Sequence, residues 1–199
     1  MDIRDIAIVL IDISGYTRFI KSHKSSMVHA EEIIFQLLDA IVEGSTHPLL
    51  LNKFEGDAVL MYAESGSTPL EVAQSVLDQV MRAFPVFQTK AKQLESDRAT
   101  CPCDACRNIR QLRLKVIVHY GKAAFRSIRQ FVEIAGEDVI IAHRLLKNTV
   151  PLHEYILMTD AFYELLEPAI LGPGSEHIES IADIGPISTR YFCVKAPAQ

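Results

Sequence analysis

The fold of this chain is decided by two stretches of sequence, of which the first is Ile8-Val9-Leu10-Ile11-Asp12-Ile13-Ser14-Gly15. A long apolar run that is rich in β-branched residues and free of proline is typical of a buried strand, so Asp12 is expected at the strand's end. The second stretch, Lys53-Phe54-Glu55-Gly56-Asp57-Ala58-Val59-Leu60, predicts a hairpin turn at Gly56 with Asp57 directly behind it. Carboxylates at neighbouring strand ends repel each other unless a proton or a divalent cation lies between them. Because hard oxygen ligands select such cations, the sequence predicts a site for a metal and a phosphate.

Length and charge exclude several classes of protein. At 199 residues the chain is long enough for one well-buried core, and we expect a single domain over residues 1–199. Its formal charge of -5, with lysine and arginine scattered along the chain, argues against nucleic acid or an anionic membrane as the partner. The apolar runs are too short to span a bilayer, and Met1-Asp2-Ile3-Arg4-Asp5 lacks the basic region of a signal peptide. We therefore expect a cytoplasmic protein that does not enter the membrane.

Hydrophobic periodicity predicts strands that alternate with helices. An apolar helical stripe runs from Ile33 to Val42, and a second helix starts at Pro69 and is expected to kink or end at Pro85. A strand is expected over residues 112–120, broken by Gly121. The remaining predicted elements are one or two strands within residues 123–134, a helix over 136–147, a strand at 154–158, a helix at 161–167 and a strand at 191–195. This alternation predicts an α/β fold with helices over the sheet.

Four motifs in these elements resemble the catalytic domain of the class III nucleotide cyclases, the adenylyl and guanylyl cyclases. Asp12-Ile13-Ser14-Gly15-Tyr16-Thr17 is similar to the family's Asp-x-x-Gly-Phe-Thr, and residues 53–58 are similar to its Lys-x-x-Gly-Asp-Ala. Residues 116–121 resemble its strand Gly-Ile-His-x-Gly, and residues 136–144 resemble its Gly-Asp-x-Val-Asn-x-Ala-x-Arg. The resemblance implies a divergent member with a ferredoxin-like α+β sandwich, a mixed and mostly antiparallel sheet, and a head-to-tail homodimer with shared active sites.

The resemblance also implies a role for each matched residue. Asp12, Asp57 and the backbone carbonyl of Ile13 would bind two Mg²⁺ or Mn²⁺ ions, which activate the ribose 3′-hydroxyl of a nucleoside triphosphate and neutralise its phosphates. Lys53 and Glu133 would contact the purine ring. Residues implied for the phosphates are Arg144, at the transition state, and Arg126, Arg129 or Arg190, in place of a late lysine that is missing near residues 183–186.

One position departs from the family pattern in a way that bears on activity. Where the family has an asparagine that orients the ribose, this chain has Ile140, whose side chain has neither donor nor acceptor. Loss of one preorganised donor typically lowers the rate by about a hundredfold or more. Two functions are therefore predicted. The first is a cyclase that converts ATP or GTP into the cyclic monophosphate and pyrophosphate, and the alternative is a degenerate cyclase-homology domain that binds a metal–nucleotide complex and regulates a partner or its own dimerisation.

Each candidate residue also has a purely structural explanation. Asp12 would cap the turn that follows it, Lys53 would be an exposed hairpin residue, and Arg144 would be a solvated charge on its helix. His119 is interpreted as a packed, hydrogen-bonded residue of the core rather than a ligand. The combination of Asp12 with the motif around Asp57 favours the metal site over the turn cap.

The segment at about residues 93–110 is expected to be an inserted loop, and it carries three cysteines. Cys101, Cys103 and Cys106 lie close enough in sequence to bind one Zn²⁺ ion, and the Cys103-x-x-Cys106 pair has the spacing usual for such sites. The fourth ligand is not identified, although Cys193 or a histidine would complete the set. A loop of reduced thiols and a redox-sensing pair remain the alternatives, the latter as the basis of a metal- or redox-responsive interaction protein.

Overall fold

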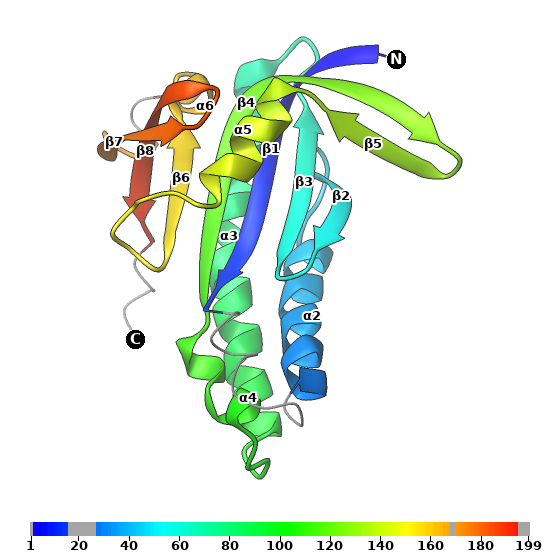
Figure 1. Cartoon of the computed structure of the whole chain (residues 1–199), viewed down its shortest axis with the longest axis vertical. Coiled ribbons are helices and arrows are strands. Elements are labelled where there is room, and N and C mark those ends of the chain that lie inside the picture. Colours follow the sequence, from blue (N-terminus) through cyan, green and yellow to red (C-terminus); the bar gives the residue numbers. More distant parts are fainter. Residues whose placement is uncertain (1, 16–26, 168–169, 195–199) are drawn as a thin grey trace.

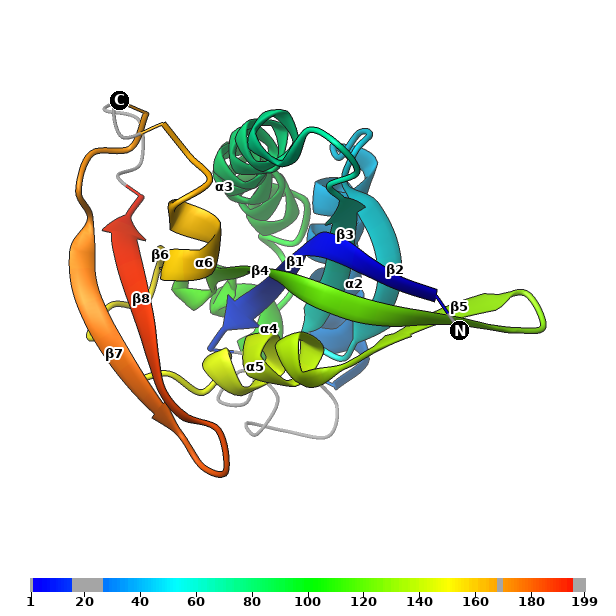
Figure 2. The ribbon, with the colours of Figure 1, turned by 90° about the horizontal axis from the view of Figure 1, so that it is seen from above.

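The computed structural model describes residues 2–15, 27–167 and 170–194, so Tyr16 and Thr17 of the first motif lie outside the described residues. A mixed sheet forms the centre, with two long helices against one face and a shorter helix against the other (Figures 1 and 2). The described helices are α2 (Met27–Glu43), α3 (Pro69–Asp97), α4 (Asp104–Arg107), the 3₁₀ turn η2 (Ile109–Gln111), α5 (Glu137–Leu145) and α6 (Asp160–Tyr163).

The described strands form one eight-stranded sheet. They are β1 (Asp2–Ser14), β2 (Leu50–Glu55), β3 (Ala58–Glu64), β4 (Arg113–Ile128), β5 (Phe131–Ala135), β6 (Tyr155–Thr159), β7 (Ser175–Ile181) and β8 (Gly185–Cys193). Their order is β2-β3-β1-β4-β6-β8-β7, and β5 pairs with β4 in a hairpin that projects from the body (Figure 1). Only the β4–β6 pair is parallel among the described pairs. The predicted ferredoxin-like fold with a mixed, mostly antiparallel sheet is confirmed.

The apolar run of β1 is unbroken because both of its faces are covered. Val9 and Ile11 pack into the cluster formed with α2 and α3, whereas Ile8 and Leu10 pack into the cluster formed with α5. A strand between two such layers has no solvent face, so its sequence does not alternate between apolar and polar residues. Asp12 is the first polar residue after this run, and near the end of β1 it is paired with Ala58 of β3 and Lys115 of β4.

Strand β4 does not break at Gly121, contrary to the expectation from the sequence. A Cβ atom at this position would lie 2.2 Å from the carboxyl carbon of Asp138. The Asp138 carboxylate instead accepts a hydrogen bond from the backbone N–H of Lys122 at 2.6 Å. Gly121 therefore gives α5 a close approach to the strand, which is the other reason for a glycine inside a strand.

Three other elements differ from the predictions. Helix α3 passes through Pro85 and ends at Asp97, inside the segment expected to be a loop, because Phe84 and Phe87 on either side of the proline are buried in the core. Helix α6 ends at Tyr163 rather than at residue 167. Strand β7 was not predicted, because most of this edge strand is exposed and its sequence is polar. In the described part of the chain, no helix has the length and apolar character needed to cross a bilayer.

Candidate active site and cysteine cluster

The structure brings Asp12 and Asp57 to neighbouring positions. In the register of β1 and β3, Asp12 is paired with Ala58, the residue that follows Asp57. The backbone N–H of Ile13 donates to the carbonyl oxygen of Asp57 at 3.0 Å, which holds the β2–β3 turn against the end of β1. Gly56 has φ +68° in this turn, a conformation that glycine adopts without strain. The hairpin motif therefore serves to place the second carboxylate beside the first.

A hollow of about 790 Å³ lies over the two carboxylates. It is lined by Asp12, Ile13, Ser14, Gly15, Asp57, Gln111, Arg113, Lys115, Leu146, Lys147 and His153. Lys115 was not predicted from the sequence, although this residue lies directly opposite Asp12 in the register of β1 and β4. Its ammonium group is 3.1 Å from Asp12 Oδ2 and donates to the carbonyl oxygen of Leu146 at 3.0 Å. The ammonium group of Lys115 thus lies beside the two carboxylates.

The electrostatics of the hollow favour a further cation. Burial raises the pKa of Asp12, and Lys115 only partly opposes this effect. Burial also raises the pKa of Asp57, and the nearby charge of Asp12 raises it further. Arg113 and Lys147 also line the hollow, but among the described ion pairs only Lys115 contacts either carboxylate, through Asp12. Because carboxylate and carbonyl oxygens are the ligands that Mg²⁺ and Mn²⁺ prefer, Asp12, Asp57 and the Ile13 carbonyl fit such ions.

Lys53 and Glu133 form a second group of charged residues with partners that the sequence analysis did not name. Lys53 Nζ lies 3.7 Å from Glu133 Oε2 and 3.5 Å from Glu55 Oε1. His143 on α5 contacts Glu55 through Nε2 at 2.9 Å. This group joins β2, β5 and α5, and its members are not among the described residues that line the carboxylate hollow. Within this chain, the residues predicted to bind the metal and those predicted to contact the purine therefore lie apart.

The arginines expected to contact phosphates are dispersed. Arg144 on α5 and Arg129 in the β4–β5 turn are exposed, and neither is among the described residues that line the hollow. Arg190 is engaged elsewhere, with Asp160 Oδ1 at 3.3 Å and Glu176 Oε1 at 3.0 Å. Arg113, which the sequence analysis did not single out, does line the hollow. Ile140 lies on α5 with 52% of its surface exposed, so it faces out from the protomer rather than into its core.

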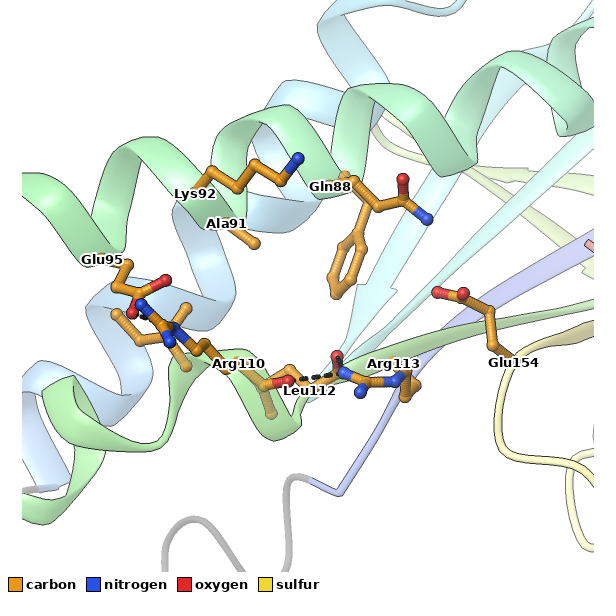
Figure 3. A pocket seen from close by; sticks show the side chains of 10 residues that line it. Gln88, Ala91, Lys92, Glu95, Arg110, Leu112, Arg113 and Glu154 are labelled. Carbon is orange, nitrogen blue, oxygen red and sulfur yellow. Dashed lines mark hydrogen bonds and ion pairs between the residues drawn. The ribbon is translucent and has the colours of Figure 1, made fainter. Parts of the chain in front are cut away.

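A separate hollow of about 500 Å³ lies between α3 and the segment that leads into β4 (Figure 3). Arg110 closes one end of it through an ion pair with Glu95, and Arg113 donates to the carbonyl oxygens of Arg110 and Leu112 (Figure 3). These cations are already paired within the protein. The carboxylate hollow is the better candidate for a reaction site, because among the described ion pairs only Lys115 contacts its two carboxylates.

The three cysteines of the predicted zinc site are also brought together, and His29 at the start of α2 joins them. Cys193 lies apart from the cluster, exposed at the end of β8. Hydrogen bonds from Cys103 lower the pKa of Cys101 to about 7. Burial and the neighbouring sulfur of Cys103 raise the pKa of Cys106 to about 12. Because the three sulfur atoms lie close together, ionisation of one thiol makes ionisation of the others less favourable.

Comparison with other proteins identifies the family of the chain. Residues 34–155 match the family model described as "Protein of unknown function (DUF2652)". The chain belongs to the DUF2652 family. A relative in Mycobacterium tuberculosis (strain ATCC 25618 / H37Rv), "Uncharacterized protein Rv2561/Rv2562", is 33% identical over 157 residues, which cover 79% of this chain and 71% of the relative.

The fold of this chain is similar to the folds of solved adenylyl and guanylyl cyclases, as the motifs predicted. The guanylyl cyclase Cya2 has a TM-score of 0.73 at 14% identity, over 98% of this chain and 95% of that chain. The adenylyl cyclase CyaB from P. aeruginosa has a TM-score of 0.69 at 14% identity, over 100% of this chain and 98% of that chain. At this identity the likeness concerns the fold, and this DUF2652 protein is a divergent member of it.

Proposed function

We propose that this DUF2652 protein is a nucleotide cyclase that converts ATP or GTP into the cyclic monophosphate and pyrophosphate as a homodimer. The observation that carries the proposal is the convergence of Asp12, Asp57 and Lys115 in one hollow of a cyclase fold. In this reaction the ribose 3′-oxygen attacks the α-phosphorus while the bond to pyrophosphate breaks. Negative charge therefore changes on two oxygen atoms of the substrate, the attacking ribose 3′-oxygen and the leaving oxygen of pyrophosphate.

The residues of the hollow have distinct tasks in this proposal. Asp12, Asp57 and the Ile13 carbonyl hold the divalent ions, Mg²⁺ or Mn²⁺. When bound, these ions lower the pKa of the 3′-hydroxyl and offset the charge on the departing pyrophosphate. Lys115 is within reach of the same space and neutralises phosphate oxygens as a point charge.

A head-to-tail homodimer is supported by the separation of the two groups in one protomer. Lys53 and Glu133 are proposed to contact the purine, and Arg144 the phosphate at the transition state, in the hollow of the partner protomer. Apolar residues are exposed near this second group, with Phe131 62% and Phe54 38% exposed. Exposed apolar surface of this kind is typical of a protein–protein interface. Asn52 Nδ2 donates to the Val132 carbonyl at 2.9 Å, which holds β2 and β5 together as one surface.

The direct test is to incubate the purified protein with ATP and with GTP in the presence of Mn²⁺ and to search for cyclic product by mass spectrometry. Product is expected, and it should disappear in Asp57→Ala. The matched control is Asp78→Ala, which removes an exposed carboxylate from α3, away from the hollow. Equal activity of Asp57→Ala and the wild type would refute the proposed metal site.

A second candidate function is supported by Ile140. The class III cyclases have at this position an asparagine that orients the ribose, whereas the isoleucine side chain forms no hydrogen bond. In this alternative the protein binds a metal–nucleotide complex and regulates a partner or its own dimerisation without turnover. Ile140→Asn separates the two candidates. Increased product formation in this variant would indicate a competent site, whereas Mn²⁺-dependent nucleotide binding without product in both proteins would indicate a regulatory module.

A further inference from the structure

Four potential metal ligands converge at one end of the helical layer. His29 lies in the first turn of α2, Cys101 and Cys103 follow α3, and Cys106 lies in α4. The Nδ1 atom of His29 is 3.5 Å from Cys101 Sγ, 3.4 Å from Cys103 Sγ and 3.6 Å from Cys106 Sγ. All four ligand atoms lie within 4.8 Å of one another. Figure 1 shows α4 beside the start of α2, which brings these distant parts of the sequence together.

Hydrogen bonding does not explain this geometry. An imidazole Nδ1 carries either one proton or one lone pair, so it can satisfy one of the three sulfur atoms and not all of them. A tetrahedral zinc ion with one nitrogen and three sulfur ligands does explain it. With Zn–N of about 2.0–2.1 Å and Zn–S of about 2.3 Å, each N–S edge of the tetrahedron is about 3.6 Å. The three separations from His29 match this single value.

We propose that His29, Cys101, Cys103 and Cys106 bind one structural Zn²⁺ ion. The Cys103-x-x-Cys106 pair has the form of a zinc knuckle, because Cys103 caps α4 and its sulfur accepts from the backbone N–H of Cys106 at 3.5 Å. With three thiolates and one neutral imidazole, all four coordination positions are filled by protein atoms. A closed site of this kind is structural rather than catalytic.

The surroundings supply a compensating charge. Three thiolates and Zn²⁺ together carry one negative charge, and Arg98 at the end of α3 interacts with Cys106. Arg98 is itself held by Glu32 of α2, with Nη2 and Oε2 3.0 Å apart. The ligand set and its counter-charge thus come from the same three segments of the chain. This arrangement matches the outer partners that usually orient metal ligands.

The proposed ion connects segments that are far apart in the sequence. His29 and Cys101 are separated by 72 positions, and the ion would tie the start of α2 to the segment between α3 and β4. Closing a long loop in the unfolded chain lowers its entropy, so the ion stabilises the folded state.

The first experiment is metal analysis of the protein purified without added chelator, by inductively coupled plasma mass spectrometry. About one zinc per chain is expected. His29→Ala and Cys103→Ser should each weaken zinc binding by at least about 100-fold in competition with a chromogenic chelator. The matched control is Cys193→Ser, which removes a cysteine outside the cluster and should retain zinc. Unchanged zinc affinity of both cluster variants in this competition would overturn the proposal.

A spectroscopic measurement keeps the proposal testable if a cluster variant does not fold. Wild-type protein stripped of metal and loaded with Co²⁺ should show thiolate-to-cobalt charge-transfer bands and the strong d–d bands of tetrahedral coordination. His29→Cys should keep four ligands, all of them now sulfur atoms, and should shift the charge-transfer bands. Failure of the wild type to take up either Zn²⁺ or Co²⁺, with the cysteines free or joined in a disulfide, would overturn the proposal. These readouts do not involve nucleotide, so they are independent of cyclase activity.

Discussion

The carboxylate hollow and the cysteine cluster are both groups of acidic ligands, but they differ in chemistry and in enclosure. The hollow offers carboxylate and carbonyl oxygens at the edge of a space of about 790 Å³. The cluster offers three sulfurs and one nitrogen, all within 4.8 Å of one another. Hard oxygen ligands in an open site suit an exchangeable ion that shares its coordination with substrate, whereas soft ligands in a closed site suit a permanent ion. This difference is the reason for proposing reaction chemistry in the first region and a stabilising ion in the second.

The largest expected effect concerns activity and separates the two regions. Asp57→Asn keeps the shape of the side chain but removes the charge that holds the metal, so product formation should fall by at least about 100-fold. Zinc content should not change. The measurement is cyclic-product formation by mass spectrometry together with metal analysis of the same sample. Loss of zinc along with activity would show that the two regions are not independent.

The next effect concerns stability. Removal of zinc with a thiophilic chelator should lower the melting temperature by about 10 °C, which corresponds to roughly 3 kcal/mol for a chain of this size. Differential scanning calorimetry measures this shift. Asp57→Asn should show the same shift as the wild type, and Cys103→Ser should show none. If the chelator has the same effect on Cys103→Ser, the stabilising ion lies elsewhere.

A smaller effect is expected from Lys115. Lys115→Met keeps the alkyl stem but removes the cation beside Asp12, so triphosphate binding in Mn²⁺ should weaken by about tenfold, or 1.4 kcal/mol. The control is Lys122→Met on the same strand, which removes an exposed cation paired with Asp5. Isothermal titration calorimetry with a non-hydrolysable triphosphate measures both. Tighter binding by Lys115→Met would mean that Lys115 competes with the metal instead of contacting phosphate.

The smallest effect is a background pH dependence that belongs to neither region. Burial lowers the pKa of His119 below its ordinary value of 6.5, although Asp138 partly opposes this shift. Since the unfolded chain binds this proton more readily, the folded state should lose stability as pH falls through 6.5 towards the lowered value. Thermal melts between about pH 7 and pH 5 should show a shallower slope for His119→Gln. An unchanged slope would assign the pH dependence to other groups.

His119 also illustrates a correct interpretation from sequence. It was predicted to be a packed, hydrogen-bonded residue, and the structure places it 2.8 Å from Thr159 Oγ1 and 3.0 Å from Asp138 Oδ1. The buried strand that ends near Asp12 and the hairpin at Gly56 were predicted equally well. In each of these cases the pattern is local, since apolar runs, turn glycines and their spacing act within a few residues.

Predictions that failed were those in which a distant contact overrides a local preference. Gly121 was expected to end a strand, but the close approach of Asp138 explains the glycine and the strand continues. Pro85 was expected to kink or end a helix, and the helix does not end there, because burial of the residues around the proline carries it onward to Asp97. The roles of Lys53, Glu133, Arg129 and Arg144 stay predictions, since these residues do not meet the carboxylates within one protomer.

By itself the sequence determined the strands and helices with strong periodicity, the cyclase-like fold, the carboxylate pair at two strand ends and the three cysteines. Only the tertiary structure decided that Lys115 faces Asp12 and that His29 is the fourth member of the cysteine cluster. The reason is physical. Sheet register and helix packing bring together residues that are many positions apart, and these pairings are set by the whole core rather than by the neighbours of either residue.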